Sequence, residues 1–225
     1  MANFKPVPVF YQADNIKRSV WVVVDPRDFV TGVRVPVPLE VRLRDVAAEP
    51  IAAQSGIYCF TDLNLAAGNY TVQVRPLGRD RNRYFDADKE FPLDPIPLPS
   101  QPLKRNPVLV DLLPKTAYPF DSQSTLARGR LLKTSNASPI ENAQIFLTLD
   151  SLDNGLRGRT DERGEFVIFF PPTTPKPEID TSAGVKDFKF QLRFVIPGNP
   201  SHSTAEETVK EGTAISINEI KFPGT

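Results

Sequence analysis

Proline is the residue type that most restricts what this chain can fold into. The sequence has 225 residues, of which 23 are proline and 12 are glycine. Proline lacks a backbone N–H and has a fixed φ angle, so it interrupts helices and is confined to strand edges, bulges and turns. A chain with this many prolines cannot be mainly helical, and we expect an all-β fold.

A two-residue alternation of apolar and polar side chains recurs along the chain, whereas no window has the repeat of a stable helix. In residues 19–25, Val20, Val22 and Val24 face one way, and Pro26 is expected to end the strand. The other strands expected in the first half are residues 38–45, 56–62, 69–75, 83–85, 89–91 and 108–113. About seven strands are enough for one sandwich.

The second half has the same kind of pattern. Its expected strands are residues 126–132, 143–150, 165–170, 188–196 and 214–222. The core-facing side chains expected in two of them are Ile145, Leu147, Leu149, Phe188, Phe190, Leu192 and Phe194. The unbroken apolar run of residues 166–170 indicates a strand that is buried on both faces.

Three stretches lack this alternation. Residues 92–102 carry a proline at every second or third position, which favours an extended strap along a sheet edge over a ligand for an aromatic groove. Residues 171–185 form a loop long enough for a binding role. Residues 114–124 follow the last strand of the first half, and we expect the domain boundary there, giving domains of residues 1–114 and 115–225.

Three segments of the second half are similar to a known family. They are residues 128–132 (RGRLL), 138–147 (SPIENAQIFL) and 159–166 (RTDERGEF). In the last segment, Asp161 and Gly164 are expected to form a hairpin turn, with Phe166 entering the core behind it. The segments resemble the carboxypeptidase regulatory-like (transthyretin-like) sandwich family. That resemblance implies a β-sandwich for residues 115–225 and no particular activity, because the family serves as a spacer or docking module on unrelated proteins.

The first half repeats this plan more faintly, in residues 35–43, 55–60 and 67–74. The sequence leaves open whether the first domain is of this type or a general immunoglobulin-like sandwich. The expected fold is therefore all-β, with two tandem immunoglobulin-like or transthyretin-like β-sandwiches. In overall character the chain also resembles the cap or baseplate accessory proteins of phage-tail-like contractile injection systems.

Residues able to carry chemistry are scarce. The chain has one cysteine, Cys59, in an apolar run that predicts a buried and inert thiol, and one histidine, His202, in a polar stretch that predicts a surface loop. A single His and a single Cys cannot assemble a zinc site of the usual ligands, and no G-x-S-x-G elbow is present. We expect no catalytic, cofactor-binding or metal-binding residues, and the protein is not expected to be an enzyme.

One cation site stays open at this point. Asp150, Asp153 and Asp161 flank a loop expected over residues 151–160 and could gather at one sandwich end around calcium. They lack the spacing of a calcium-binding loop, so turn formation and solubility explain them better.

Charge and hydropathy limit the partners and the location. The 27 basic and 27 acidic residues cancel, so no field draws the chain to nucleic acid. The alternating Arg79, Arg81 and Arg83 indicate a solvated hairpin tip or a contact to an acidic partner. No stretch approaches the roughly 18 apolar residues of a membrane span, and the first residues lack a signal-peptide pattern. We expect a cytoplasmic protein, or one that leaves the cell by a route without a cleaved signal.

Two functions fit these observations. The first is a non-catalytic structural adaptor with protein partners in a larger assembly, such as a contractile injection system. Those partners can include further copies of the same chain. The second is a surface module that binds carbohydrate or a receptor. The second would need exposed aromatic rings among Trp21, Tyr58, Tyr70 and Tyr84, whereas their alternating strand positions favour core packing.

Overall fold

The computed structural model describes residues 20–61, 63, 65–93, 106–171, 187–217 and 219–222. In these residues the chain is nearly all β, with sixteen strands and one short 3₁₀-helix, η1 (Gly78–Asn82). The predicted all-β fold is confirmed. Most of the proline strap and nearly all of the 171–185 loop lie outside the described residues. None of the helices in the described part of the chain is long and apolar enough to span a membrane.

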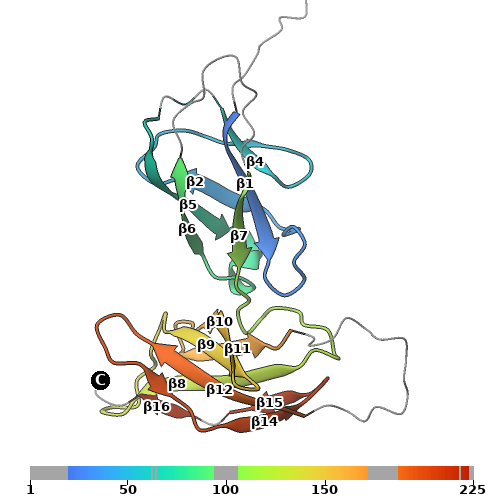
Figure 1. Cartoon of the computed structure of the whole chain (residues 1–225), viewed down its shortest axis with the longest axis vertical. Helices are drawn as coiled ribbons and strands as arrows, with labels where there is room; N and C mark the ends of the chain where they lie inside the picture. The colour runs from blue at the N-terminus through green and yellow to red at the C-terminus, as the bar shows by residue number, and fades with distance from the viewer. Residues whose placement is uncertain are drawn as a thin grey trace, which may run out of the picture.

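The first sandwich pairs a four-stranded sheet with a three-stranded sheet (Figure 1). The larger sheet has the order β3-β4-β1-β7, made of β1 (Val20–Asp28), β3 (Ile51–Ala52), β4 (Tyr58–Thr61) and β7 (Val108–Leu112). The smaller sheet has the order β2-β5-β6, made of β2 (Leu39–Leu43), β5 (Gly68–Pro76) and β6 (Ala87–Leu93). Alternate residues of both sheets enclose one core that includes Val22, Val24, Val41, Phe60, Val72, Val74, Val110 and Leu112.

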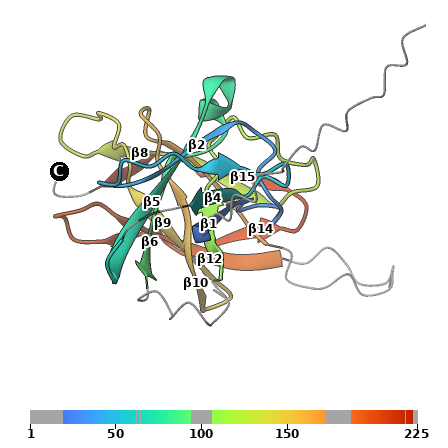
Figure 2. The same cartoon turned by 90° about the horizontal axis from the view of Figure 1, so that it is seen from above.

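The second sandwich follows the same principle with a larger, phenylalanine-rich core. One sheet contains β9 (Gln144–Leu149), β10 (Leu152–Arg159), β12 (Asp187–Val195), β13 (His202–Ser203) and β14 (Glu207–Lys210). The other contains β8 (Leu126–Lys133), β11 (Glu165–Phe169), β15 (Ala214–Ser216) and β16 (Ile220–Phe222). The side chains expected to face the core are confirmed, since all seven, from Ile145 to Phe194, are buried. In the view from above in Figure 2, the first sandwich lies over the second.

The hairpin before β11 forms as expected. Gly164 has φ +72° and its N–H donates to the Asp161 carbonyl at 2.9 Å, while the Asp161 carboxylate accepts from the N–H groups of Arg163 and Glu165. Phe166 follows directly and is 1% exposed in the core. A side chain at Gly164 would collide with the Leu131 carbonyl, so both the φ angle and the close approach require glycine.

The expectation that Pro26 ends the first strand is wrong. β1 continues to Asp28, and Pro26 pairs with Val110 of the parallel strand β7. The partner on the other side, β4, has its last pair at Val24. Beyond Val24, that side of β1 has only irregular pairing, a single bridge between Arg27 and Arg34 and a hydrogen bond from the Val35 N–H to the Pro26 carbonyl, so a missing N–H at Pro26 costs little.

Other differences concern short or polar strands. β10 occupies most of the stretch that was expected to be a loop, and β3, β13 and β14 were not expected at all. Residues 83–85 form a single bridge, between Tyr84 and Pro114, in place of a strand. The last expected strand is divided into β15 and β16, both parallel to β8.

The described residues hold two separate core clusters. The first runs from Trp21 to Leu112 and the second from Ala127 to Phe222. The expected boundary between residues 114 and 115 falls in the connection between them. This connection packs against both sandwiches, so the exact boundary stays a prediction.

Candidate docking surfaces and interdomain junction

The side chains that could carry catalytic or metal-binding chemistry do not come together in the structure. His202 is half-buried in β13, paired with Phe194 and with its ring 5.8 Å from that of Phe222, so its expected place in a surface loop is wrong. It lies there because residues 202–203 add a short strand to the edge of β12.

Asp161 is separated from Asp150 and Asp153 by the length of β10. Asp150 and Asp153 lie at the β9–β10 hairpin, where their carboxylates accept from the N–H groups of Lys189 and Gly155. Asp161 lies beyond the other end of β10, a strand of eight residues or roughly 26 Å. No group of three His, Cys, Asp or Glu side chains suited to a metal is found among the described residues.

The arginine-rich tip between β5 and β6 is exposed to solvent, in agreement with the first of the two alternatives expected for it. Arg79, Arg81 and Arg83 are exposed around η1. Arg83 pairs with Asp80 at 3.2 Å, and Arg81 donates to the Pro76 carbonyl. These contacts fix the tip locally.

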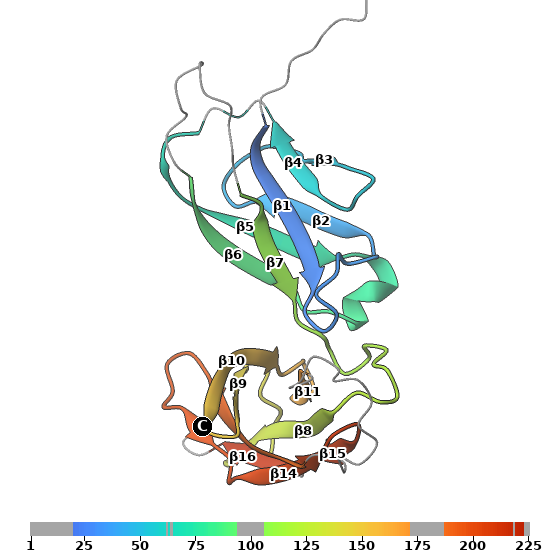
Figure 3. The same ribbon diagram turned by 45° about the vertical axis from the view of Figure 1, so that its right-hand side comes forward.

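Cys59 is not buried as expected, and it marks an apolar patch. The thiol is half-exposed because Cys59 points away from the core, between the inward-facing Tyr58 and Phe60. Register places Val23 opposite Cys59 on one side and Ile51 opposite it on the other. Val20 and Leu109 lie on this outer face as well, and we call these five residues the apolar face. The register shift between Val20 and Val22 turns Val20 outward, so the expectation that it faces the same way as Val22 and Val24 is wrong. Figure 3 shows the strands of this sheet, β3, β4, β1 and β7.

The apolar face is unusual for an outer sheet surface. Among the described residues, five large hydrophobic side chains are exposed, and three of them lie here: Val20 at 39%, Ile51 at 44% and Leu109 at 45%. None of the five residues of the apolar face belongs to the first core cluster or to the partly buried residues packed against it. Contiguous exposed apolar groups of this kind mark surfaces that are covered by something else.

A buried carboxylate closes one end of the apolar face. Asp25 is 2% exposed and accepts hydrogen bonds from Arg34 at 2.8 Å and from Arg27 at 3.0 Å. Burial raises the pKa of Asp25, but the hydrogen bonds and charges of Arg34 and Arg27 outweigh it and hold this pKa below its usual value. Arg34 also donates to the Ser55 carbonyl, so this end of the face is occupied by polar contacts.

A second buried carboxylate, Asp28, holds the connection between the sandwiches. One carboxylate oxygen accepts from the Tyr84 hydroxyl at 2.7 Å and from the Tyr118 hydroxyl at 2.6 Å. The other accepts from the N–H groups of Val30 and Thr31 at 2.7 and 3.1 Å. Burial, and next the hydrogen bond to Asp28, raise the pKa of both tyrosines well above the ordinary range.

Aromatic rings extend this contact into the second sandwich. The Tyr118 ring lies edge-on to Tyr84 at 5.4 Å and 4.6 Å from Phe120, whose ring stacks on Phe169 of β11 at 6.3 Å. Arg128 lies over Phe120, 5.6 Å from its ring centre. We call Asp28, Tyr84, Tyr118, Phe120 and Phe169 the interdomain junction.

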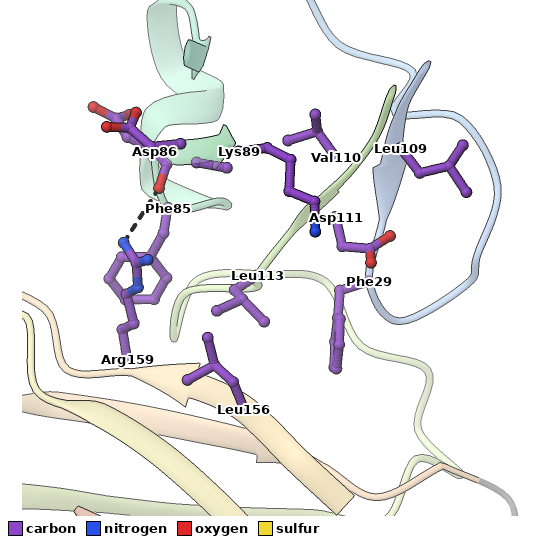
Figure 4. A pocket seen from close by; sticks show the side chains of 12 residues that line it. Phe29, Phe85, Asp86, Lys89, Leu109, Val110, Asp111, Leu113, Leu156 and Arg159 are labelled. Atoms are coloured by element: carbon purple, nitrogen blue, oxygen red, sulfur yellow. Dashed lines mark hydrogen bonds between the residues drawn. The ribbon is translucent and has the colours of Figure 1, made fainter. Parts of the chain in front are cut away.

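The sandwiches also touch directly. Arg157 of β10 lies over the ring of Phe29 at 5.2 Å, and burial lowers the pKa of this arginine. Beside it is a crevice of about 290 Å³, where Leu113 and Leu156 face one another (Figure 4). Arg159 enters the crevice from below, and its Nε is buried without a hydrogen-bond partner among the described residues.

Sequence reasoning did not identify the interdomain junction. Asp28 and Tyr118 are 90 positions apart, and neither belongs to a spaced motif. The one signal that the sequence offers is the aromatic content of residues 114–124, which contain Tyr118 and Phe120 within the predicted domain boundary.

No family model and no curated protein matches the chain, so the carboxypeptidase regulatory-like resemblance stays a prediction. Solved structures that resemble it include the Bacillus anthracis TIE protein, at 12% identity and TM-score 0.28 over 90% of this chain and 34% of that one. A streptococcal ancillary pilin matches at 12% and 0.26, over 76% and 49%. The shaft pilin SpaA of Lactobacillus rhamnosus GG matches at 10% and 0.27, over 88% and 95%. The chain thus spans about a third and about half of the first two, and likenesses this weak carry no functional argument.

Proposed function

We propose that this chain is a non-catalytic structural adaptor that holds two sandwich domains at a fixed spacing within a multi-subunit assembly. The observation that carries the proposal is the interdomain junction, in which Asp28 of the first sandwich binds Tyr118 of the connection. Tandem domains move relative to one another unless their interface restrains them. A connection fixed on both sides suits a protein whose task is to set the distance between partners.

Open sheet edges supply surfaces for those partners. The strands β2 and β10 each have a strand neighbour on only one side among the described residues. Such edges accept an added strand from another protein unless they are blocked. The register shifts in β10 twist that edge away from pairing, so β2 is the better candidate.

A finer form of the proposal names the assembly. The overall character of the sequence supports a cap or baseplate position in a phage-tail-like contractile injection system, with the protein acting in the cytoplasm, and the second domain as a carboxypeptidase regulatory-like module. Sedimentation of cell lysate, with mass spectrometry of the fractions, tests this form. Co-migration with sheath, tube or baseplate subunits supports it, and a monomer in every fraction contradicts it.

The rigid spacing can be tested on the purified chain by small-angle X-ray scattering. Tyr118→Phe removes one hydrogen bond of the interdomain junction and should broaden the distribution of molecular dimensions. Tyr70→Phe is the matched control, because the Tyr70 hydroxyl donates to the Ala66 carbonyl within the first domain. If the two variants and the unaltered chain all give the same scattering, and that scattering shows sandwiches that move freely relative to one another, the spacer proposal is contradicted.

Carbohydrate binding is not favoured by the aromatic residues named for it. Trp21 and Tyr84 are buried, at 8% and 4% exposure, and Tyr58 and Tyr70 are half-buried. A ring must present an open face to stack on a sugar. The adaptor therefore remains the better-supported function.

A further inference from the structure

The only asparagine of the chain that is followed by glycine, Asn154, lies in an irregular part of β10. Asp153 and Leu156 each have a ladder partner in β9, but the two residues between them stand opposite a single residue of that strand. Such a bulge leaves its extra residue outside the ladder of hydrogen bonds. Asn154 and Gly155 are therefore free of the regular pairing that holds the rest of β10.

The glycine makes the backbone nitrogen next to this asparagine accessible. Gly155 has φ +73°, and apart from its chain neighbours no atom lies within 4 Å of the place that a Cβ would take. Attack of its nitrogen on the side-chain amide carbon of Asn154, Cγ, closes a small ring, a succinimide. That amide is held close by, because its Nδ2 donates to the Leu152 carbonyl at 3.0 Å. The attacking nitrogen and the carbon under attack thus belong to one compact turn.

A carboxylate lies on the proton that this reaction must remove. Oδ1 of Asp153 accepts a hydrogen bond from the Gly155 N–H at 2.8 Å. A backbone amide is a poor nucleophile until it begins to lose its proton, and a carboxylate within hydrogen-bond distance can act as the general base. Asp153 is exposed, so water reaches the same turn. We propose that Asn154 is a site of self-catalysed deamidation in which Asp153 is the general base.

The reaction needs only water besides the chain itself. Asp153 takes the proton of the Gly155 N–H as this nitrogen forms a bond with Cγ of Asn154. The Cγ–Nδ2 bond then breaks, and the side-chain nitrogen leaves as ammonia with the proton that Asp153 returns. Water opens the succinimide at Cγ to give aspartate, or at the main-chain carbon to give isoaspartate. An amide is exchanged for a carboxylate, and no oxidant or reductant takes part.

The product lies beside the contact between the two sandwiches. Nε of Arg157 donates to the Asn154 carbonyl at 3.0 Å, and its guanidinium lies over the ring of Phe29 at 5.2 Å. Isoaspartate formation turns this carbonyl into a carboxylate, which binds an arginine more strongly than a neutral oxygen does. Arg157 should then be drawn toward β10 and away from Phe29. This effect on the spacing of the sandwiches rests on the proposed function, whereas the reaction itself does not.

Peptide mapping by mass spectrometry, on the full chain incubated at neutral pH, tests the reaction. Asn154 should convert to aspartate and isoaspartate, and hydroxylamine should trap the succinimide by cleaving the chain before Gly155. Asn136 is an internal control, because it is exposed but is followed by Ala137, whose N–H donates to the Lys133 carbonyl. It should stay intact while Asn154 converts.

A matched pair of variants tests the base. Asp153→Asn keeps the shape and an acceptor oxygen but removes the charge. It should slow the conversion of Asn154 by about tenfold or more, a modest share of what a positioned general base contributes, because the carboxylate is exposed. Asp150→Asn makes the same change at a carboxylate that accepts from the Lys189 N–H, and should leave the rate unchanged. Fragment-ion masses distinguish residue 154 from the introduced asparagines.

Two results would overturn the proposal. Conversion of Asn154 no faster than that of Asn136 would mean that the turn does not promote the reaction. An equal or faster rate in Asp153→Asn would mean that the hydrogen bond to the Gly155 N–H protects the turn and does not activate it.

The effect on the spacing has its own measurement. Anion exchange separates the more acidic, deamidated chain from the unmodified one, and small-angle X-ray scattering compares the two fractions. The deamidated fraction should show the broader distribution of molecular dimensions. Identical scattering from the two fractions would contradict the effect on the spacing and leave both the reaction and the interdomain junction standing.

Discussion

At the scale of single residues, Asp28 is the side chain on which most polar contacts of the interdomain junction depend. Asp28→Ala leaves the Tyr84 and Tyr118 hydroxyls and two backbone N–H groups without their acceptor. Hydrogen bonds to a charged group contribute about 1.5 to 3 kcal/mol each, with strong overlap, so we expect a loss of about 3 kcal/mol in the free energy of unfolding. Urea denaturation measures it. Asp111→Ala, at an exposed carboxylate of β7, is the control and should change stability by less than about 0.5 kcal/mol.

The two tyrosines also predict how stability depends on pH. Their pKa values in the folded chain are raised above the ordinary value of 10.0, so the folded state retains their protons longer than the unfolded state. The stability that they contribute is complete below pH 10.0 and is lost as the pH rises through the folded pKa values. Melting temperatures should therefore fall steeply above that pH. The double variant Tyr84→Phe, Tyr118→Phe should melt lower at neutral pH but show a shallower alkaline decline, and an equally steep decline would be evidence against this cause.

At the scale of elements, the turn before β11 and the strand β10 together offer a matched pair of glycines. Gly164 and Gly155 have nearly the same φ, +72° and +73°, but only Gly164 has neighbours where a Cβ would lie. Gly155→Ala should cost about 1 to 2 kcal/mol for the left-handed backbone alone. Gly164→Ala adds a collision with the Leu131 carbonyl and should cost about 2 kcal/mol more. Urea unfolding of both variants measures the difference, and equal losses would show that the turn shifts freely to make room.

The elements also show how far the sequence predicts this fold. β9 and β12 alternate so regularly that their core residues could be assigned from sequence. β10 could not, because its LDNGLRGR sequence is polar and contains two glycines, and it forms only by pairing with β9. The burial of Val167 on the outer side of β11 agrees with the predicted two-sided burial. Phe120, which stacks on the adjoining Phe169, comes from the connection that the sequence predicts only as a domain boundary.

The candidate site was less accessible to sequence reasoning than the fold. Cys59 and its neighbours look like core residues, because Val20, Val23 and Ile51 are apolar wherever they point. Only the register of β1, β3 and β4 shows that they face outward. Asp28 and Tyr118 are joined by tertiary structure alone, so no local pattern indicates their contact.

At the scale of the whole molecule, the interdomain junction should couple the unfolding of the two sandwiches. Each has its own core cluster, and without contact they would melt independently. Phe120 joins Tyr118 to Phe169 and is half-buried, so Phe120→Ala should remove about 2 kcal/mol of coupling, less than the 3 to 5 kcal/mol of a fully buried ring. Calorimetry should then show one transition for the unaltered chain and two for the variant. Phe146→Ala is the control, because Phe146 is also half-buried but packs under Arg193 within the second sandwich. That variant should lower the melting temperature while keeping a single transition, and a single transition in Phe120→Ala as well would mean that the aromatic contacts do not transmit stability between the sandwiches.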